Sequence, residues 1–320
     1  MRAQQRDTRV VAVLCLFVWS CSAGTGNGNG DADIPDDSDA AVGAFQVKVV
    51  AATTTPGYTS VFGKVFDGST PQPLVWEETA TVGDCELLVP RAPFCGEPCE
   101  GGSICVEDDE CQGYPDALSV GTVVVQGIET ASGATEFSMD PIANNYQPAV
   151  SLAYPAFSEG DAIEFDPAGT AAFAAFTLNA KGIEELDLVN DSIQVEHGLA
   201  INLEWVGPGQ SGISEIHVKL DISHHGGPKG KIECLTEDTG SLQLTAGMLG
   251  QLLDLGYAGF PTIIVTRQST GSATTAVGRV DLVVSSGAEK EVLIPGLISC
   301  NEDGDCPTGQ TCLLSDRYCI

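Results

Sequence analysis

Histidine side chains are the first groups in this sequence that could bind a metal ion or transfer a proton. The sequence has four of them, His197, His217, His224 and His225, and the last two lie in a Ser-His-His-Gly-Gly-Pro segment. Imidazole nitrogens are common ligands of transition metals. Adjacent residues of an extended chain point to opposite sides, so two neighbouring histidines do not easily share one ion. We therefore interpret residues 223–228 as a solvated loop and predict no metal site.

Residues 238–241, Asp-Thr-Gly-Ser, match the active-site tetrapeptide of aspartic proteases. In those enzymes the carboxylate shares a proton with a second carboxylate and activates water. Two such turns are needed, and neither Asp-Thr-Gly nor Asp-Ser-Gly occurs a second time here. Because Asp and Gly are the residues that tight turns require, we interpret Asp238 as part of a turn between strands.

Two acidic segments have the oxygen donors that calcium prefers. Residues 301–305, Asn-Glu-Asp-Gly-Asp, are spaced like the start of an EF-hand loop. Cys306 and Cys312 then stand where such a loop has its glycine and its bidentate glutamate. Residues 107–110, Glu-Asp-Asp-Glu, form the second acidic segment. We expect these charges to solvate the cysteine-rich segments around them, and weak calcium binding is the alternative.

Motifs that usually identify an enzyme are missing from the sequence. It has no Gly-x-Ser-x-Gly elbow, no His-Glu-x-x-His helix, no phosphate-binding loop and no dinucleotide fingerprint. This predicts a protein without catalytic residues or a cofactor. The alternative is a secreted protease or glycosidase whose catalytic carboxylates come together only in the folded chain.

The first 21 residues have the pattern of an export signal. Residues 10–19 are almost entirely apolar, three arginines precede them, and Ser20 and Cys21 follow. A basic start, a short apolar run and a small residue before the cut are typical of a secretory signal peptide. The apolar run is too short to cross a bilayer as a stable anchor. Residues 1–20 are therefore predicted to be removed.

Residues 18–21, Val-Trp-Ser-Cys, resemble the lipobox of bacterial lipoproteins. The resemblance implies that Cys21 receives diacylglycerol on its sulfur and becomes the first residue of the mature protein. With Ser22 rather than Asp after the cysteine, it also implies the outer membrane or cell surface. Acyl chains would hold the protein there firmly, because each buried methylene contributes about 0.8 kcal/mol.

The charge of the chain limits the partners that it can have. Its 14 basic and 44 acidic residues give a net charge of -30, and without residues 1–20 the charge is -32. Such a chain repels nucleic acid and anionic phospholipid surfaces. The charge suits a soluble surface domain, and it would also attract divalent cations.

Ten cysteines follow Cys21, and an even number in an exported chain indicates five disulfides. Eight of them form two short clusters, at residues 95–111 and 300–319, so pairing within each cluster is the economical assumption. Cys85 and Cys234 are then left over. If these two pair, the bridge closes a long loop worth about 4 to 5 kcal/mol and joins the two halves of the chain.

The second cluster, Cys-x5-Cys-Pro-x-Gly-x-x-Cys-x6-Cys at 300–319, resembles a mini-module of secreted myxobacterial lipoproteins and, more generally, the EB and Dickkopf type of knot. Residues 95–111 are similar to a contracted version of it. Such modules usually pair the first cysteine with the third and the second with the fourth. The resemblance therefore implies the pairs Cys95 with Cys105, Cys99 with Cys111, Cys300 with Cys312 and Cys306 with Cys319.

The remaining sequence predicts an all-β protein. Residues 21–43 are Gly, Asn, Asp and Ser with few apolar residues, which indicates a disordered acidic tether. Short alternating runs then follow, as in β-sandwiches. We predict two antiparallel, Ig-like sandwich regions, 44–190 with a cysteine-rich insertion at 85–111, and 191–297. A disulfide knot at 298–320 completes the chain.

One helix and five core residues are also predicted. Residues 245–255 repeat apolar residues at helical spacing, with Thr245 as the N-cap and Gly256 as the stop. We expect this short helix to cover one end of a sandwich. The predicted core residues are Phe62, Trp76, Phe176, Trp205 and Val218.

Together these patterns predict a lipid-anchored surface protein that binds a protein or glycan ligand without catalysis. A calcium-dependent adhesin and a secreted hydrolase are the alternatives. The sequence identifies neither the ligand nor the oligomeric state.

Overall fold

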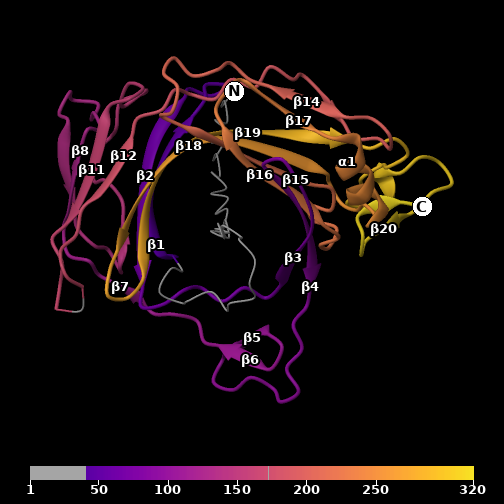
Figure 1. Ribbon diagram of the computed structural model, residues 1–320, viewed down its shortest axis with the longest axis horizontal. Coiled ribbons are helices and arrows are strands. Elements are labelled where there is room, and N and C mark those ends of the chain that lie inside the picture. The colour runs from indigo at the N-terminus through magenta and orange to yellow at the C-terminus, as the bar shows by residue number, and fades with distance from the viewer. Residues whose placement is uncertain (1–40, 172) are drawn as a thin grey trace, which may run out of the picture. The chain divides into compact units, whose positions relative to one another are not determined.

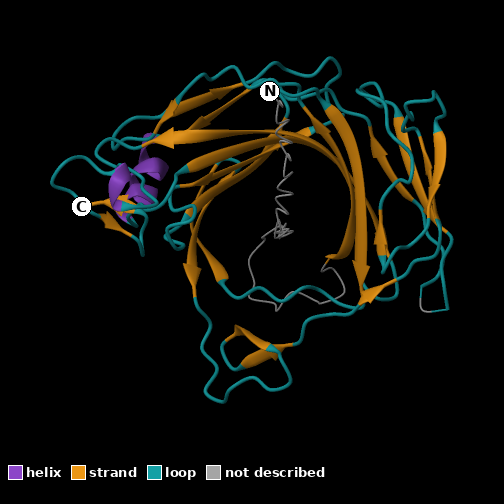
Figure 2. Ribbon diagram, turned by 180° about the vertical axis from the view of Figure 1, so that it is seen from behind, coloured by secondary structure: helices purple, strands orange, loops and turns teal. Residues whose placement is uncertain are grey.

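The computed structural model of the protein describes residues 41–171 and 173–320, and its regular structure is almost entirely strand (Figures 1 and 2). The largest element is an eleven-stranded sheet. Nine of its strands lie side by side in the order β10 (Asn145–Tyr146), β2 (Tyr58–Phe66), β1 (Ala41–Val50), β19 (Arg279–Leu293), β18 (Thr262–Thr274), β15 (Glu215–Asp221), β16 (Lys231–Glu237), β4 (Cys85–Arg91) and β3 (Val75–Val82). Two short strands, β7 (Ala117–Leu118) and β13 (Ile193–Gln194), pair with β2 and β19.

Four smaller sheets surround it. One has four strands, in the order β12 (Leu178–Lys181), β11 (Ala162–Pro167), β8 (Val123–Gln126) and β9 (Glu136–Met139). The others are two-stranded and pair β14 (Ile201–Glu204) with β17 (Ser241–Leu244), β5 (Ile104–Glu107) with β6 (Glu110–Gln112), and β20 (Cys312–Leu313) with β21 (Tyr318–Cys319). The helices are α1 (Ala246–Asp254) and the 3-10 turn η2 (Asp303–Asp305). The chain is thus all-β with small knots and one short α-helix, as the sequence predicts.

The strands of the two predicted regions share the large sheet, so the boundary at residue 190 does not separate two bodies. β1 pairs in parallel with β19, and the intervening chain forms the long connection that a parallel pair requires. The C-terminal bound that we predicted for the tether was wrong. Residues 41–43, which we assigned to it, already belong to β1, where Ala41 and Gly43 lie opposite Arg279 and Val280.

Two hydrophobic cores lie against the sheet, and each draws on both predicted regions. The four-stranded sheet packs onto β1, β2 and β19, where the ring of Phe45 lies 5.5 Å from those of Tyr146 and Phe165. The other core forms where β14, β17 and α1 pack onto β4, β15, β16 and β18. The long strands β18 and β19 reach into both cores, which makes their hairpin the shared support of the molecule.

The helix forms where it was predicted. The Thr245 hydroxyl accepts a hydrogen bond from the backbone N–H of Met248, and Gly256 takes a positive φ of 89° just after the helix. Both features are typical helix boundaries. Four apolar side chains of one face are buried in the core, Met248, Leu249, Leu252 and Leu253. None of the helices in the described part of the chain has the length and apolar character to cross a membrane.

The predicted core residues divide into three groups. Trp205 and Val218 are buried, and Trp76 and Phe176 are half-buried. The prediction was wrong for Phe62, which is 47 % exposed. Its neighbours in β2, Val61 and Gly63, are buried, and Phe62 alternates with them to the opposite face of the sheet.

Candidate ligand-binding face

One face of the eleven-stranded sheet is buried against the two cores, and the opposite face carries half-exposed side chains. The four-stranded sheet, β14, β17 and α1 all contribute to cores on the first face. We call the opposite face the open face. Both views show that the large sheet curves around it (Figures 1 and 2). Alternation along the strands therefore divides each strand into a core row and an open row.

The open face of β4, β15 and β16 carries a cluster of charged side chains. In register across these strands, Lys219 lies opposite Glu233, and Glu233 opposite Glu86. The ammonium group of Lys231 contacts a Glu233 carboxylate oxygen at 2.8 Å and lies 4.2 Å from the ring centroid of Trp76. Only 4 % of the Lys231 side chain is exposed, so the carboxylate and the aromatic ring replace its lost water.

This charged cluster changes the pKa values of two of its members. Burial lowers the pKa of His217, and the adjacent Glu233 opposes part of that effect. Burial also raises the pKa of Glu86, and the negative charges of Glu78 and Glu233 add to the rise. Both shifts follow from the same cause, because burial disfavours the charged form of each group.

The open face of β2 is different, because it carries aromatic side chains and no acid. Tyr58 is 53 % exposed and Phe62 47 %, and both alternate with buried residues of the strand. Lys64 follows on the same face, with its ammonium group 5.1 Å from the ring centroid of Phe66. Residues 41–66, which span β1 and β2, contain no Asp or Glu, although the chain has 44 acidic residues. We call Tyr58, Ser60, Phe62 and Lys64 the aromatic strip.

Asp238 lies in a tight turn between β16 and β17, as the sequence predicts, and it is also the centre of a buried network. Its carboxylate accepts hydrogen bonds from Trp205 Nε1 and Ser214 Oγ, each at 2.7 Å. It also accepts from Arg267 Nε at 2.5 Å and from Arg267 Nη2 at 3.2 Å. Because four donors occupy its two oxygens, this carboxylate holds the fold and has no free position for proton transfer.

Arg267 was missed in the sequence analysis. It belongs to β18, and its guanidinium group also donates to the backbone carbonyls of Glu185 and Val206. Only 1 % of its side chain is exposed. The signal was present, because Arg267 follows Ile263 and Val265 at core-facing spacing, where a cation needs a buried partner.

The four histidines lie in three separate environments. His224 is half-buried and His225 exposed in the turn after β15, and their ring centroids are 3.9 Å apart. Burial, and then the neighbouring imidazole of His225, lower the pKa of His224. His197 Nε2 lies 3.9 Å from Oδ1 of the exposed Asp254, and His217 belongs to the charged cluster. The structure therefore does not bring the four histidines into one site.

In the two segments considered for calcium, acidic side chains accept hydrogen bonds from backbone N–H groups. In the second segment, Asp303 accepts from Cys312 N at 2.9 Å, and Asp305 accepts from Asn301 N at 2.8 Å. In the first, Asp108 accepts from Phe94 N and Asp109 from Gly96 N. The Phe94 N–H, and after it the Arg91 guanidinium, lower the pKa of Asp108.

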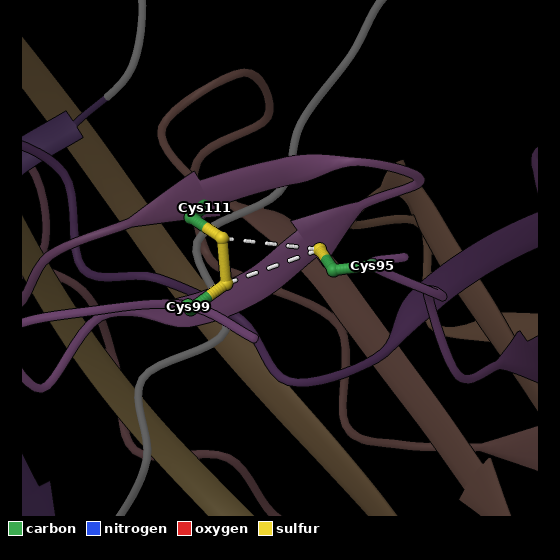
Figure 3. A group of neighbouring side chains, drawn as sticks. All are labelled: Cys95, Cys99 and Cys111. Atoms are coloured by element: carbon green, nitrogen blue, oxygen red, sulfur yellow. Dashed lines mark hydrogen bonds between the residues drawn. A yellow bond between two sulfur atoms is a disulfide. The ribbon is translucent and has the colours of Figure 1, made fainter. Parts of the chain in front are cut away.

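All ten cysteines that follow Cys21 are joined in five disulfides, and the left-over pair, Cys85 and Cys234, is one of them. The other four bridges are the pairs that the resemblance to the mini-module implies, Cys95–Cys105, Cys99–Cys111, Cys300–Cys312 and Cys306–Cys319. In the first knot the sulfur of Cys95 lies beside the Cys99–Cys111 bridge (Figure 3). Sulfur atoms that are bonded in disulfides are not thiolates, so this group is not a metal site.

The first knot ties the two ends of the curved sheet together. At the end of β4, Arg91 forms ion pairs with Glu77 on β3 and with Glu107 and Asp108 in the knot. At the other end, the knot residue Gln112 donates to Ser69, which lies in the segment that leaves β2. The Asp67 N–H donates to the Asp116 carbonyl, and the Asp116 N–H donates to the Asp67 carboxylate. The cysteine-rich insertion thus connects the end of β4 to the segment that follows β2, and we call this connected edge the rim of the open face.

Cys21 and the predicted signal segment 1–20 lie outside the described residues. No protein-family model matches the sequence, and a comparison with curated proteins found no match either.

Proposed function

We propose that the protein is an exported lipoprotein whose folded part binds a ligand through the open face of its large sheet and does not catalyse a reaction. The observation that carries this proposal is the open face itself. It presents exposed aromatic residues and a charged cluster on a sheet whose rim is fixed by a disulfide knot. Binding sites of this kind are favoured by rigid support and by aromatic side chains that lose little entropy on contact.

The anchor in this proposal is a lipid on Cys21, which would hold the protein at the outer membrane or cell surface. Five disulfides support export, because such bonds persist in oxidising compartments. The net negative charge fits this position. It repels nucleic acid and anionic lipid, so neither is the ligand in this proposal.

Replacement of Cys21 tests the anchor. In the native host, Cys21→Ser should move the protein from the membrane fraction to the soluble fraction and remove the acyl mass from its N-terminal peptide. Cys15→Ser, within the predicted signal, is the matched control and should leave both unchanged. Membrane retention of Cys21→Ser without an acyl group would contradict the anchor.

Site-specific cross-linking tests the open face. A photoreactive amino acid at Thr270, which lies on the open face of β18, should capture a surface component from intact cells. The same group at Leu314, a 61 % exposed residue of the C-terminal knot, should not. Equal capture from both positions would contradict binding at this face. Turnover of a peptide or glycan by the purified protein, lost in Glu233→Gln, would favour the hydrolase alternative.

A further inference from the structure

We infer that the aromatic strip of β2 binds a linear polysaccharide without net charge, an inference that rests on the proposed function and names the class of ligand. The strip combines two exposed aromatic rings with polar groups. Tyr58 and Phe62 are four residues apart on one face of a strand, which places them about 13 Å apart. Ser60 lies between them on the same face.

The neighbouring strands continue this surface with uncharged side chains, most of them polar. Phe62 lies opposite Gln46 on β1, Gln46 lies opposite Val283 on β19, and Val283 lies opposite Thr270 on β18. One row further, Ser285 lies opposite Gln268, whose amide donates to Glu215 Oε1 at 3.1 Å. Hydroxyl and amide groups donate and accept hydrogen bonds without requiring a charge on the ligand. Sugars present the matching surface, since their apolar C–H faces stack on aromatic rings and their hydroxyls bond to such groups.

Electrostatics selects a neutral ligand over a charged one. A polyanion would be repelled by a chain with a net charge of -30. A polycation would find no acidic partner on β1 or β2, which contain no Asp or Glu, and it would meet the ammonium group of Lys64 on the strip. A neutral polymer meets neither barrier.

The curvature of the sheet selects an extended chain over a globular partner. The aromatic strip lies on the inner side of the curve (Figures 1 and 2). The knot contacts that join Arg91 to Asp108 and Gln112 to Ser69 hold the two ends of the sheet in place. A single extended polysaccharide chain can follow such a surface and contact both aromatic rings of the strip.

Affinity electrophoresis of the purified mature protein tests the inference. Native gels containing dextran, laminarin or xylan supply neutral polysaccharides, and a gel containing alginate supplies a polyanion. At least one neutral polysaccharide should retard the protein, and alginate should not. The double variant Tyr58→Ala/Phe62→Ala should weaken the retention at least tenfold. Both side chains are about half buried, so the variant should melt at a somewhat lower temperature, and circular dichroism checks that it is folded at the temperature of the gel.

The matched control is Phe94→Ala/Tyr114→Ala, which removes two aromatic side chains that are 73 % and 63 % exposed away from the strip. It should be retained like the wild type. The inference is overturned if no neutral polysaccharide retards the protein, if alginate alone does, or if the two double variants behave alike. If the Thr270 cross-linker captures a protein instead of a glycan, the ligand class is wrong while binding at the open face stands. If it captures nothing, the proposed function fails as well.

Discussion

Arg267 is a cation whose whole side chain lies inside the protein, and each group around it compensates for lost water. Asp238 neutralises its charge, and two backbone carbonyls accept hydrogen bonds from two further N–H groups. A buried ion pair of this kind adds little stability compared with a well-packed apolar pair, but the loss of one partner is costly. The network therefore joins β18 to the loop residues Glu185 and Val206 in one fixed arrangement.

Asp238→Asn should lower the free energy of unfolding by about 3 to 5 kcal/mol, because Arg267 would remain as a buried charge without its counter-ion. Urea unfolding followed by circular dichroism measures the change. Asp254→Asn, at a position whose side chain is 75 % exposed, is the control and should shift stability by less than about 0.5 kcal/mol. Wild-type stability of Asp238→Asn would contradict the role of the network.

His217 should make the stability of the protein depend on pH. Burial lowers its pKa in the folded state, whereas the unfolded chain takes up a proton near the ordinary value of about 6.5. The contribution of the neutral imidazole is complete above that value and is lost as the pH falls below it towards the folded pKa. Between pH 7 and 5, His217→Gln should therefore lose less stability than the wild type.

Urea midpoints measured at half-unit pH steps test this expectation. His197→Gln removes a histidine whose side chain is 62 % exposed, and it should follow the wild-type curve. Identical pH profiles for His217→Gln and the wild type would show that the imidazole does not titrate with folding.

At the scale of elements, the Cys85–Cys234 bridge fastens the β3–β4 hairpin to the rest of the sheet. The two cysteines lie directly opposite each other on β4 and β16. They are separated by 149 residues, whereas the knot bridges each span 10 to 13. A bridge that closes a longer loop restricts the unfolded chain more.

Removal of this bridge in Cys85→Ala/Cys234→Ala should lower the free energy of unfolding by about 5 kcal/mol, as chain entropy gives for such a loop. The Cys99–Cys111 bridge closes a loop of 12 residues, so Cys99→Ala/Cys111→Ala should lower the free energy of unfolding by only about 3 kcal/mol. Guanidinium unfolding of the two variants gives both numbers. A larger loss from the knot bridge than from Cys85–Cys234 would contradict this order.

Local patterns predicted most elements, whereas the pairing between them was not predictable. The chain forms the short strands that alternation indicates, and the helix begins at the residue after Thr245, its predicted N-cap. The parallel partnership of β1 with β19 has no local signal, because it joins segments more than two hundred residues apart. Phe62 was assigned to the core on its apolar character alone, and only the sheet determines which face it occupies.

The sequence indicated which residue types could form a site, but it did not indicate which of them lie together in the fold. Sequence reasoning found the acidic segments and the histidines, and it interpreted the acidic segments as parts of the knots, where the structure places their hydrogen bonds. It did not find the open face, because His217, Lys231 and Trp76 come from three separate strands. Residues far apart in sequence gather there through sheet register alone.

At the scale of the whole molecule, the net charge of -30 raises the question of calcium. A calcium-dependent adhesin would be stabilised by about 2.7 kcal/mol when calcium exceeds its dissociation constant a hundredfold. Backbone N–H groups already donate hydrogen bonds to the carboxylates of Asp108, Asp303 and Asp305.

We therefore expect millimolar calcium to leave the melting temperature unchanged, apart from the small shift that an equal ionic strength of sodium chloride also produces. Differential scanning calorimetry with matched salt controls measures this. A rise seen with calcium but not with sodium would revive the adhesin alternative.

The position of β1 has a mechanical consequence. β1 begins at Ala41 and is hydrogen-bonded along its length to β2 on one side and β19 on the other. When the N-terminus is held at a membrane, as proposed, any tension on the molecule enters at this inner strand. A pull along β1 must shear two ladders at once, whereas a pull on the edge strand β3 would peel one ladder bond by bond. Under that proposal, the fold would receive force at a strand that two hydrogen-bonded ladders hold.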